Sequence, residues 1–174
     1  MKSFFNGILI ILISIVLAIV YGIIHDLVTA NICVEYFTIG HPKIIENESP
    51  ITMAFLWGII ATWWAGLFIG LLLAFASQVG EWPKYAPLKL IQPILVLLSI
   101  MGISALIAGI VGGILFESGS IQIIPRYNAV LLPEKHRPFM IDLFAHSASY
   151  FVGFLGGIGL AIWVIIKRWK LSKV

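Results

Sequence analysis

The residues best suited to chemistry lie in HDLVTANICVEYFTIGHP, residues 25–42, and in a second segment near residue 142. Together they offer imidazole nitrogens and carboxylate oxygens, the ligand types that suit zinc, iron or manganese. The sequence therefore provides a set of candidate ligands for a divalent transition metal, the one cofactor that it suggests: His25, Asp26, Glu35, His41, Asp142 and His146.

The spacing of these residues matches no specific metal signature. Asp142 and His146 are four residues apart, which places them on one face of a helix. An H-E-x-x-H motif and the E-x-x-H repeats of di-iron bundles are both missing from the sequence. A structural network remains the alternative: Asp26 could pair with Arg126 or Arg137, and Asp142 near a helix start would complement the helix dipole.

Other catalytic chemistries find less support. Ser147 and Ser149 flank His146, but the G-x-S-x-G elbow of a serine hydrolase is missing. The glycines lie inside apolar segments rather than in a phosphate-binding loop. Since no histidine falls near a helix midpoint, a haem held by two histidines within the bilayer is disfavoured. Catalytic residues therefore cannot be assigned from the sequence.

Composition indicates a membrane protein. The chain has 174 residues, of which 60% are hydrophobic and 11% charged, and its mean hydropathy is +1.05. Soluble domains carry about a quarter charged residues. The length suits a single domain over residues 1–174. Although the net charge is +3, the basic residues are scattered, which argues against nucleic acid as a partner.

Four apolar segments predict transmembrane helices at about 4–24, 51–76, 90–116 and 139–166. Each reaches the roughly 20 residues that span a bilayer core. In lipid the backbone must satisfy its own hydrogen bonds, so helices are expected. The first segment has about 20 apolar residues, which exceeds the core of a cleaved signal peptide. The expected fold class is an all-α membrane protein, a compact four-helix bundle.

The charges predict an orientation. The N-terminus, loop 77–89 and the C-terminal tail hold seven basic residues and one acid, whereas the segments 25–50 and 117–142 hold four basic residues and seven acids. Under the positive-inside rule, both termini are expected in the cytoplasm. All four histidines then fall on the outer side or at its rim. They either form a site there or collect in the longest polar loops.

Small residues recur every four positions in three of the helices, and such rows let helix backbones approach closely in lipid. We therefore expect tight packing with little room for a wide pore. The rows comprise Gly58, Thr62, Gly66, Gly70 and Ala74; Ala105, Gly109 and Gly113; and Gly153, Gly157 and Ala161.

The first outer segment has a second pattern. Residues 28–37 alternate with period two and are rich in β-branched types, which predicts a short β segment paired with SIQII at 120–124. A continuation of the first helix is the competing interpretation. Cys33 is the lone cysteine, so an intramolecular disulfide is excluded, and its flanking Ile32 and Val34 favour a buried thiol.

The runs YGIIHDLVTANICVEYFTIGHPKI, WGIIATWWAG and HSASYFVGFLGG give the chain a family resemblance. It resembles a family of bacterial four-helix integral membrane proteins marked by an HDxVT…EYFTxGHP motif. The resemblance implies a multi-pass protein of the bacterial inner membrane. The family has no established activity, so the resemblance implies no catalytic residue.

These observations lead to two functional hypotheses. The first is a membrane component that binds a protein partner or small ligand through its outer face. The alternative is a metal-binding protein or metal-dependent membrane enzyme. A small-solute transporter is less favoured, because transport usually requires an ionisable residue at mid-membrane. If the stretch at 25–42 folds back to cap the bundle, His25 and Asp26 should lie close to Asp142 and His146. Each carboxylate there should then have a hydrogen-bonding partner among these residues or the loop arginines.

Overall fold

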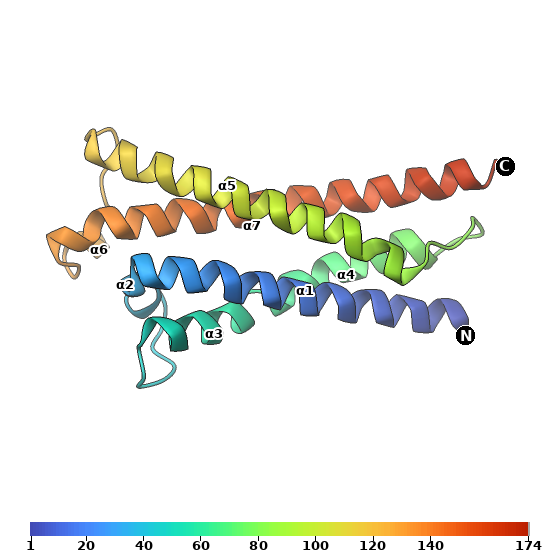
Figure 1. Ribbon diagram of the computed structural model, residues 1–174, viewed down its shortest axis with the longest axis horizontal. Coiled ribbons are helices and arrows are strands. Elements are labelled where there is room, and N and C mark those ends of the chain that lie inside the picture. Colours follow the sequence, from blue (N-terminus) through green and yellow to red (C-terminus); the bar gives the residue numbers. More distant parts are fainter. Residues whose placement is uncertain (174) are drawn as a thin grey trace.

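The computed structural model describes residues 1–173, and this part of the chain is all helical (Figure 1). The long elements are α1 (Lys2–Ile32), α3 (Pro50–Ile60), α4 (Trp63–Gln78), α5 (Ile91–Glu117) and α7 (Pro133–Leu171). Three short elements connect them: α2 (Val34–Thr38), η1 (Pro87–Leu90) and α6 (Pro125–Asn128). Four helical stretches, at 2–32, 50–78, 87–117 and 133–171, are long and apolar enough to cross a membrane. The four predicted segments are thus confirmed as helices.

Prolines mark the helix starts, but one boundary differs from the prediction. Pro50 is the first residue of α3, and the Ser49 hydroxyl caps that helix by accepting a bond from the Thr52 backbone N–H. The fourth helix was expected from about residue 139, yet α7 begins at Pro133 and contains Pro138. Because Pro138 lies in the second turn, its missing N–H removes one hydrogen bond without ending the helix.

The predicted β segment is not found in residues 1–173. Residues 28–32 continue α1, residues 34–38 form α2, and 120–124 are irregular. The hydroxyl of Thr29 donates to the His25 carbonyl and the amide of Asn31 donates to the Leu27 carbonyl, so both polar groups bond within α1. Cys33 then adopts an extended conformation that ends α1. The competing interpretation, a continued first helix, is correct as far as Ile32.

The helices form two closely packed hairpins. In the first hairpin, α1 packs against α3 and α4; in the second, α5 packs along α7. Small residues make the first contact close: a Cβ at Gly58 would lie 2.6 Å from the Ile23 backbone nitrogen, and one at Gly66 would lie 2.7 Å from the Ile15 Cα. The predicted role of the row in the second span is confirmed.

The second hairpin relies on similar approaches. A Cβ at Gly112 would lie 2.6 Å from the Phe144 side chain, and Gly109 and Gly113 pack against Ile141. The two hairpins meet mainly through α4 and α7. Between them lies a cavity of about 460 Å³. The glycine rows therefore make the packing tight within each hairpin, and larger side chains border the space that remains between the hairpins.

A break divides the second span at Ala61 and Thr62, which the sequence did not predict. The Thr62 hydroxyl donates to the Gly58 carbonyl, and the Tyr150 hydroxyl donates to the Ala61 carbonyl at 3.3 Å. In a bilayer such freed backbone groups need protein partners. Thr62, at the break itself, and Tyr150, on α7, supply them here.

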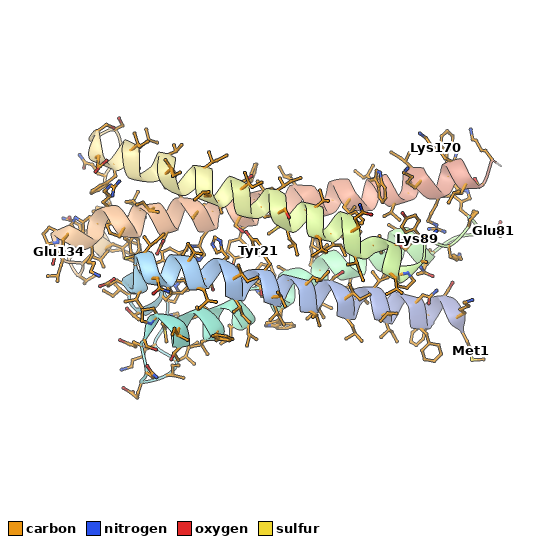
Figure 2. All side chains as sticks on the ribbon, in the orientation of Figure 1. Met1, Tyr21, Glu81, Lys89, Glu134 and Lys170 are labelled. Carbon is orange, nitrogen blue, oxygen red and sulfur yellow. The ribbon has the colours of Figure 1, made fainter. Side chains whose placement is uncertain are left out.

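The two ends of the molecule differ in charge. Both termini and the 79–86 loop lie at one end, and the connections 33–49 and 118–132 lie at the other, which we call the distal end (Figure 1). Lys89 and Lys170 mark the terminal end and Glu134 the distal end in Figure 2. This arrangement matches the grouping of loops from which the orientation was predicted.

One residue of the basic group has another role. Arg168 is only 3% exposed, and its guanidinium donates to the carbonyls of Ala76, Val79, Trp82 and Pro83. These are the free carbonyls at the end of α4 and in the loop that follows it. Arg168 thus caps a helix C-terminus from a neighbouring helix.

Candidate functional site

Three of the six candidate ligands meet between the hairpins. His25 and Asp26 lie near the end of α1, and His146 lies on α7. The Nε2 atom of His146 is 3.3 Å from Asp26 Oδ1, and the two imidazole rings are 4.5 Å apart at an angle of 80°. One ligand atom from each residue lies within 4.8 Å of the others. We call these residues the triad; their predicted proximity is confirmed.

The triad is shielded from solvent. Asp26 and His146 are 4% and 7% exposed. The Nδ1 atom of His146 lies 2.8 Å from the Asp142 backbone carbonyl. A carbonyl oxygen only accepts hydrogen bonds, so Nδ1 carries the proton and Nε2 is left with a lone pair in the neutral ring. The Nε2 atom of His25 is buried and has no partner within the part of the chain that the structure describes.

The short helix α2 covers the triad. The ring of Tyr36 stacks on His146 with centroids 4.3 Å apart, and Phe37 meets the same ring edge-on at 5.5 Å. Burial raises the pKa of Tyr36 above its ordinary value, so its hydroxyl stays protonated at neutral pH. The stretch 25–42 therefore does fold back over the bundle, but as a helix rather than a strand.

His41 lies on the same cavity but outside the triad. Its Nδ1–H donates to the Tyr36 carbonyl at 3.0 Å, and its ring lies 4.5 Å from that of Trp57. Burial lowers the pKa of His41 below its ordinary value, although the hydrogen bond to Tyr36 opposes this shift. His41 is therefore a neutral imidazole that packs against aromatic side chains.

Glu35 does not join the triad. Its carboxylate forms an ion pair with Lys135 at 2.8 Å, and the Cys33 thiol donates to its second oxygen at 3.4 Å. Burial alone would raise the pKa of Glu35, but the hydrogen bond and charge of Lys135 lower it below the usual range. Cys33 is 1% exposed, as predicted, and burial raises the pKa of its thiol to about 12. The ion pair of Glu35 therefore attaches α2 to α7, and Cys33 lies in a buried apolar cluster with Phe139 of α7.

Asp142 is also outside the triad. Its side chain is fully buried, and neither carboxylate oxygen has a partner within residues 1–173. The expectation that every carboxylate at this end is paired is wrong for Asp142. Since α7 begins nine residues earlier than Asp142, the proposed dipole role also fails. Arg137 instead pairs with Glu117 at 2.9 Å, and Arg126 contacts Tyr127, so neither arginine pairs with Asp26.

A second polar layer lies next to the triad. The hydroxyls of Tyr21 and Ser149 are 2.7 Å apart, joining α1 to α7. Figure 2 labels Tyr21, part-way along α1. The Tyr150 hydroxyl reaches the helix break, as described above. These polar groups continue the lining of the cavity from the triad toward its middle.

The cavity has one polar end and an apolar remainder. His41 and Tyr36 join the triad at the polar end. Along α1 the lining extends from Asp26 to Ser14, a distance of about 18 Å at 1.5 Å rise per residue. No lysine or arginine among residues 1–173 lines the cavity. The apolar part is formed by Phe68, Ile69, Leu97, Leu98, Met101 and Phe154.

The sequence reasoning missed several polar residues of the site. Tyr21 lies four residues before His25, and Ser149 and Tyr150 lie three and four residues after His146. Those spacings place them on the helix faces that carry the triad. Extending the two faces by one turn toward the middle of α1 and α7 would have identified them.

Comparison of the chain with known protein families, with curated proteins and with solved structures gave no match. The function is therefore inferred from the residues of the site.

Proposed function

We propose that the chain is a multi-pass protein of the bacterial inner membrane, with both termini cytoplasmic, that binds a small amphipathic ligand between its two hairpins. The observation that carries this proposal is the cavity of about 460 Å³, whose one end is polar and whose remaining wall is apolar. Its size falls within the roughly 300–1,000 Å³ of small-molecule sites. We therefore propose that the small ligand of the first hypothesis binds inside the bundle rather than on its outer surface.

The polar end indicates the chemistry of the ligand's head. Histidine, tyrosine and serine groups both donate and accept hydrogen bonds. A phosphate or carboxylate head would require a cation, and lysine and arginine are missing from the described lining. We therefore propose an uncharged head that bears a hydroxyl or carbonyl oxygen.

The apolar part indicates a hydrocarbon body. Aromatic and aliphatic side chains from α4, α5 and α7 line it, and burying an apolar chain there is favourable. Many large apolar side chains are exposed along the long helices, among them Val16, Phe75, Ile103 and Phe151. Such a surface suits contact with lipid, from which a molecule of this kind would partition. A prenol or a fatty alcohol is the matching chemical class.

A thermal-shift experiment tests this proposal. Purified protein is treated with a chelator, so that no bound metal ion can hold a phosphate, and is mixed in detergent micelles with farnesol, an uncharged prenol, or with farnesyl phosphate. Farnesol should raise the melting temperature, since a ligand at about 100 times its Kd stabilises by roughly 2.7 kcal/mol. Farnesyl phosphate should not.

Two variants locate the effect. Ala65→Leu places extra side-chain volume in the cavity and should abolish the shift. Gly159→Leu is the matched control, because the space around Gly159 is open and the residue lies away from the lining. An equal shift in both variants, or none in the original protein, would overturn the proposal. Reporter fusions after Val174 and near Glu46 test the orientation: only the former should show cytoplasmic activity.

A further inference from the structure

We propose that the triad of His25, Asp26 and His146 binds one divalent transition metal ion of the zinc or iron class at the polar end of the cavity. This goes beyond ligand binding, because it assigns a metal to three of the six residues that the sequence nominated. Two imidazoles and one carboxylate form a common donor set for catalytic zinc and for non-haem iron.

Two hydrogen-bond acceptors, His146 Nε2 and Asp26 Oδ1, face each other in the triad. The Asp142 carbonyl fixes the proton of His146 on Nδ1, so Nε2 points its lone pair at Asp26 Oδ1. A carboxylate and a lone pair 3.3 Å apart repel each other unless a cation lies between them. A metal ion would satisfy both groups, and a shared proton is the competing explanation.

The distances between the ligand atoms also fit a bound metal ion. Bonds of about 2.0–2.1 Å in a tetrahedral site place two ligand atoms roughly 3.3 Å apart. The separation of Asp26 Oδ1 and His146 Nε2 is 3.3 Å. All three ligand atoms lie within 4.8 Å of one another, so a small rotation of the His25 side chain would complete the set. His25 Nε2 is buried without a partner, as a ligand atom awaiting a cation would be.

Neighbouring groups hold the side chains of the triad in position. The hydrogen bond from His146 to a backbone carbonyl is the second-shell contact by which proteins orient metal-binding histidines. The stacked ring of Tyr36 further restrains the His146 imidazole. Lysine and arginine are missing from the described lining of the cavity, so no fixed cation competes for Asp26. A structural metal site would use four protein ligands, whereas three leave an open position.

The open position links the metal to the cavity. A water molecule, or the head oxygen of the ligand, would complete the coordination there. This link rests on the proposed function, but metal binding by the triad does not, since its three ligands come from the protein alone.

Metal analysis of the full chain tests the inference. The protein is purified with an affinity tag that contains no histidine, stripped with a chelator, and supplied with Zn²⁺ or with Co²⁺ as a spectroscopic probe. We expect one Zn²⁺ per chain by mass spectrometry of the metal content. We also expect a visible absorption band from four- or five-coordinate Co²⁺.

Near-isosteric variants identify the ligands. His25→Gln, Asp26→Asn and His146→Gln should each weaken Co²⁺ binding by at least about 100-fold, more than the loss of a second-shell partner. His136→Gln is the matched control that should retain the band, because His136 lies outside the triad and outside the lining of the cavity. Circular dichroism and size-exclusion chromatography show whether each variant keeps its fold. If His146→Gln does not fold, His25→Gln provides the test.

Two results would overturn the inference. One is a chelated and resupplied protein that binds neither metal; the other is binding that His25→Gln and His136→Gln reduce equally. In either case the proton-bridged network is the correct explanation of the triad. Farnesol binding is measured on the same samples. Absence of metal binding with retained farnesol binding refutes only the metal site. Metal binding without farnesol binding refutes only the cavity ligand.

Discussion

The close approach of α1 and α3 gives a prediction with a definite sign. A Cβ at Gly58 would lie 2.6 Å from Ile23 N, 2.7 Å from Ile23 Cα and 2.9 Å from the Gly22 carbonyl carbon. The first of these distances falls 0.8 Å short of an ordinary contact of 3.4 Å. All three atoms belong to the backbone of α1, so no side-chain rotation relieves the overlap. Gly58→Ala must push the two helices apart.

The magnitude follows from two opposing terms. Overpacking of a close contact costs about 1–3 kcal/mol, and the upper end applies when backbone atoms clash. The gain in helix propensity from glycine to alanine returns about 1 kcal/mol. Gly58→Ala should therefore lose roughly 2 kcal/mol net. Gly159→Ala has open space around its Cβ and should gain up to about 1 kcal/mol.

The assay is reversible unfolding in mixed detergent micelles, followed by circular dichroism and tryptophan fluorescence. Gly157→Ala adds an informative intermediate case, because its Cβ would meet the flexible end of the Ile69 side chain rather than backbone. The expected order of stability is Gly159→Ala, then Gly157→Ala, then Gly58→Ala. If Gly58→Ala is as stable as Gly159→Ala, the first hairpin is not held by backbone contact and the packing argument is refuted.

Three further predictions concern buried or paired polar groups. Asp142→Asn should leave the melting temperature unchanged or raise it, because an uncharged amide replaces a carboxylate that has no partner; a fall equivalent to more than about 2 kcal/mol would show that the carboxylate is bonded. The pKa of Glu35 is lowered in the folded state, so its stabilisation is complete above its unfolded pKa and is lost as the pH falls through the folded pKa. Melting curves of Glu35→Gln should thus differ from the original protein at neutral pH, by at most about 1 kcal/mol for a pair whose Lys135 is 36% exposed, and converge in acid. Arg168→Leu should cost about 2–4 kcal/mol and increase protease cleavage in the 79–86 loop, because it leaves four carbonyls uncapped; Arg168→Lys should recover only part of this, and full recovery would show that charge alone suffices.

The sequence predicted the long elements well because uninterrupted apolar runs of about 20 or more residues strongly favour helices. It also predicted that His25, Asp26 and His146 meet, since the neighbouring ends of antiparallel helices lie at one level. The alternation at residues 28–37 was misleading because side-chain bonds within α1 satisfy Thr29 and Asn31 without a strand partner.

Other features depend on contacts between distant segments. The break at Ala61 is stabilised by the Tyr150 hydroxyl, 89 residues away, and neither residue type indicates a helix end. The Lys135 ammonium directs Glu35 away from the triad, a choice that depends on the position of α2 over α7. The cavity arises where side chains of two hairpins do not fill the space between them, and such volumes are not evident from helix periodicity.

The division of the triad between the hairpins affects how the protein assembles. His25 and Asp26 belong to the first hairpin and His146 to the second. Each hairpin joins segments close in the chain, so its contacts form at low cost in loop entropy. We therefore expect docking of one hairpin on the other to come later and to create the triad in the same step. A chain with full helical content but undocked hairpins would lack the triad, and binding at the triad would favour the docked protein over its half-assembled precursor.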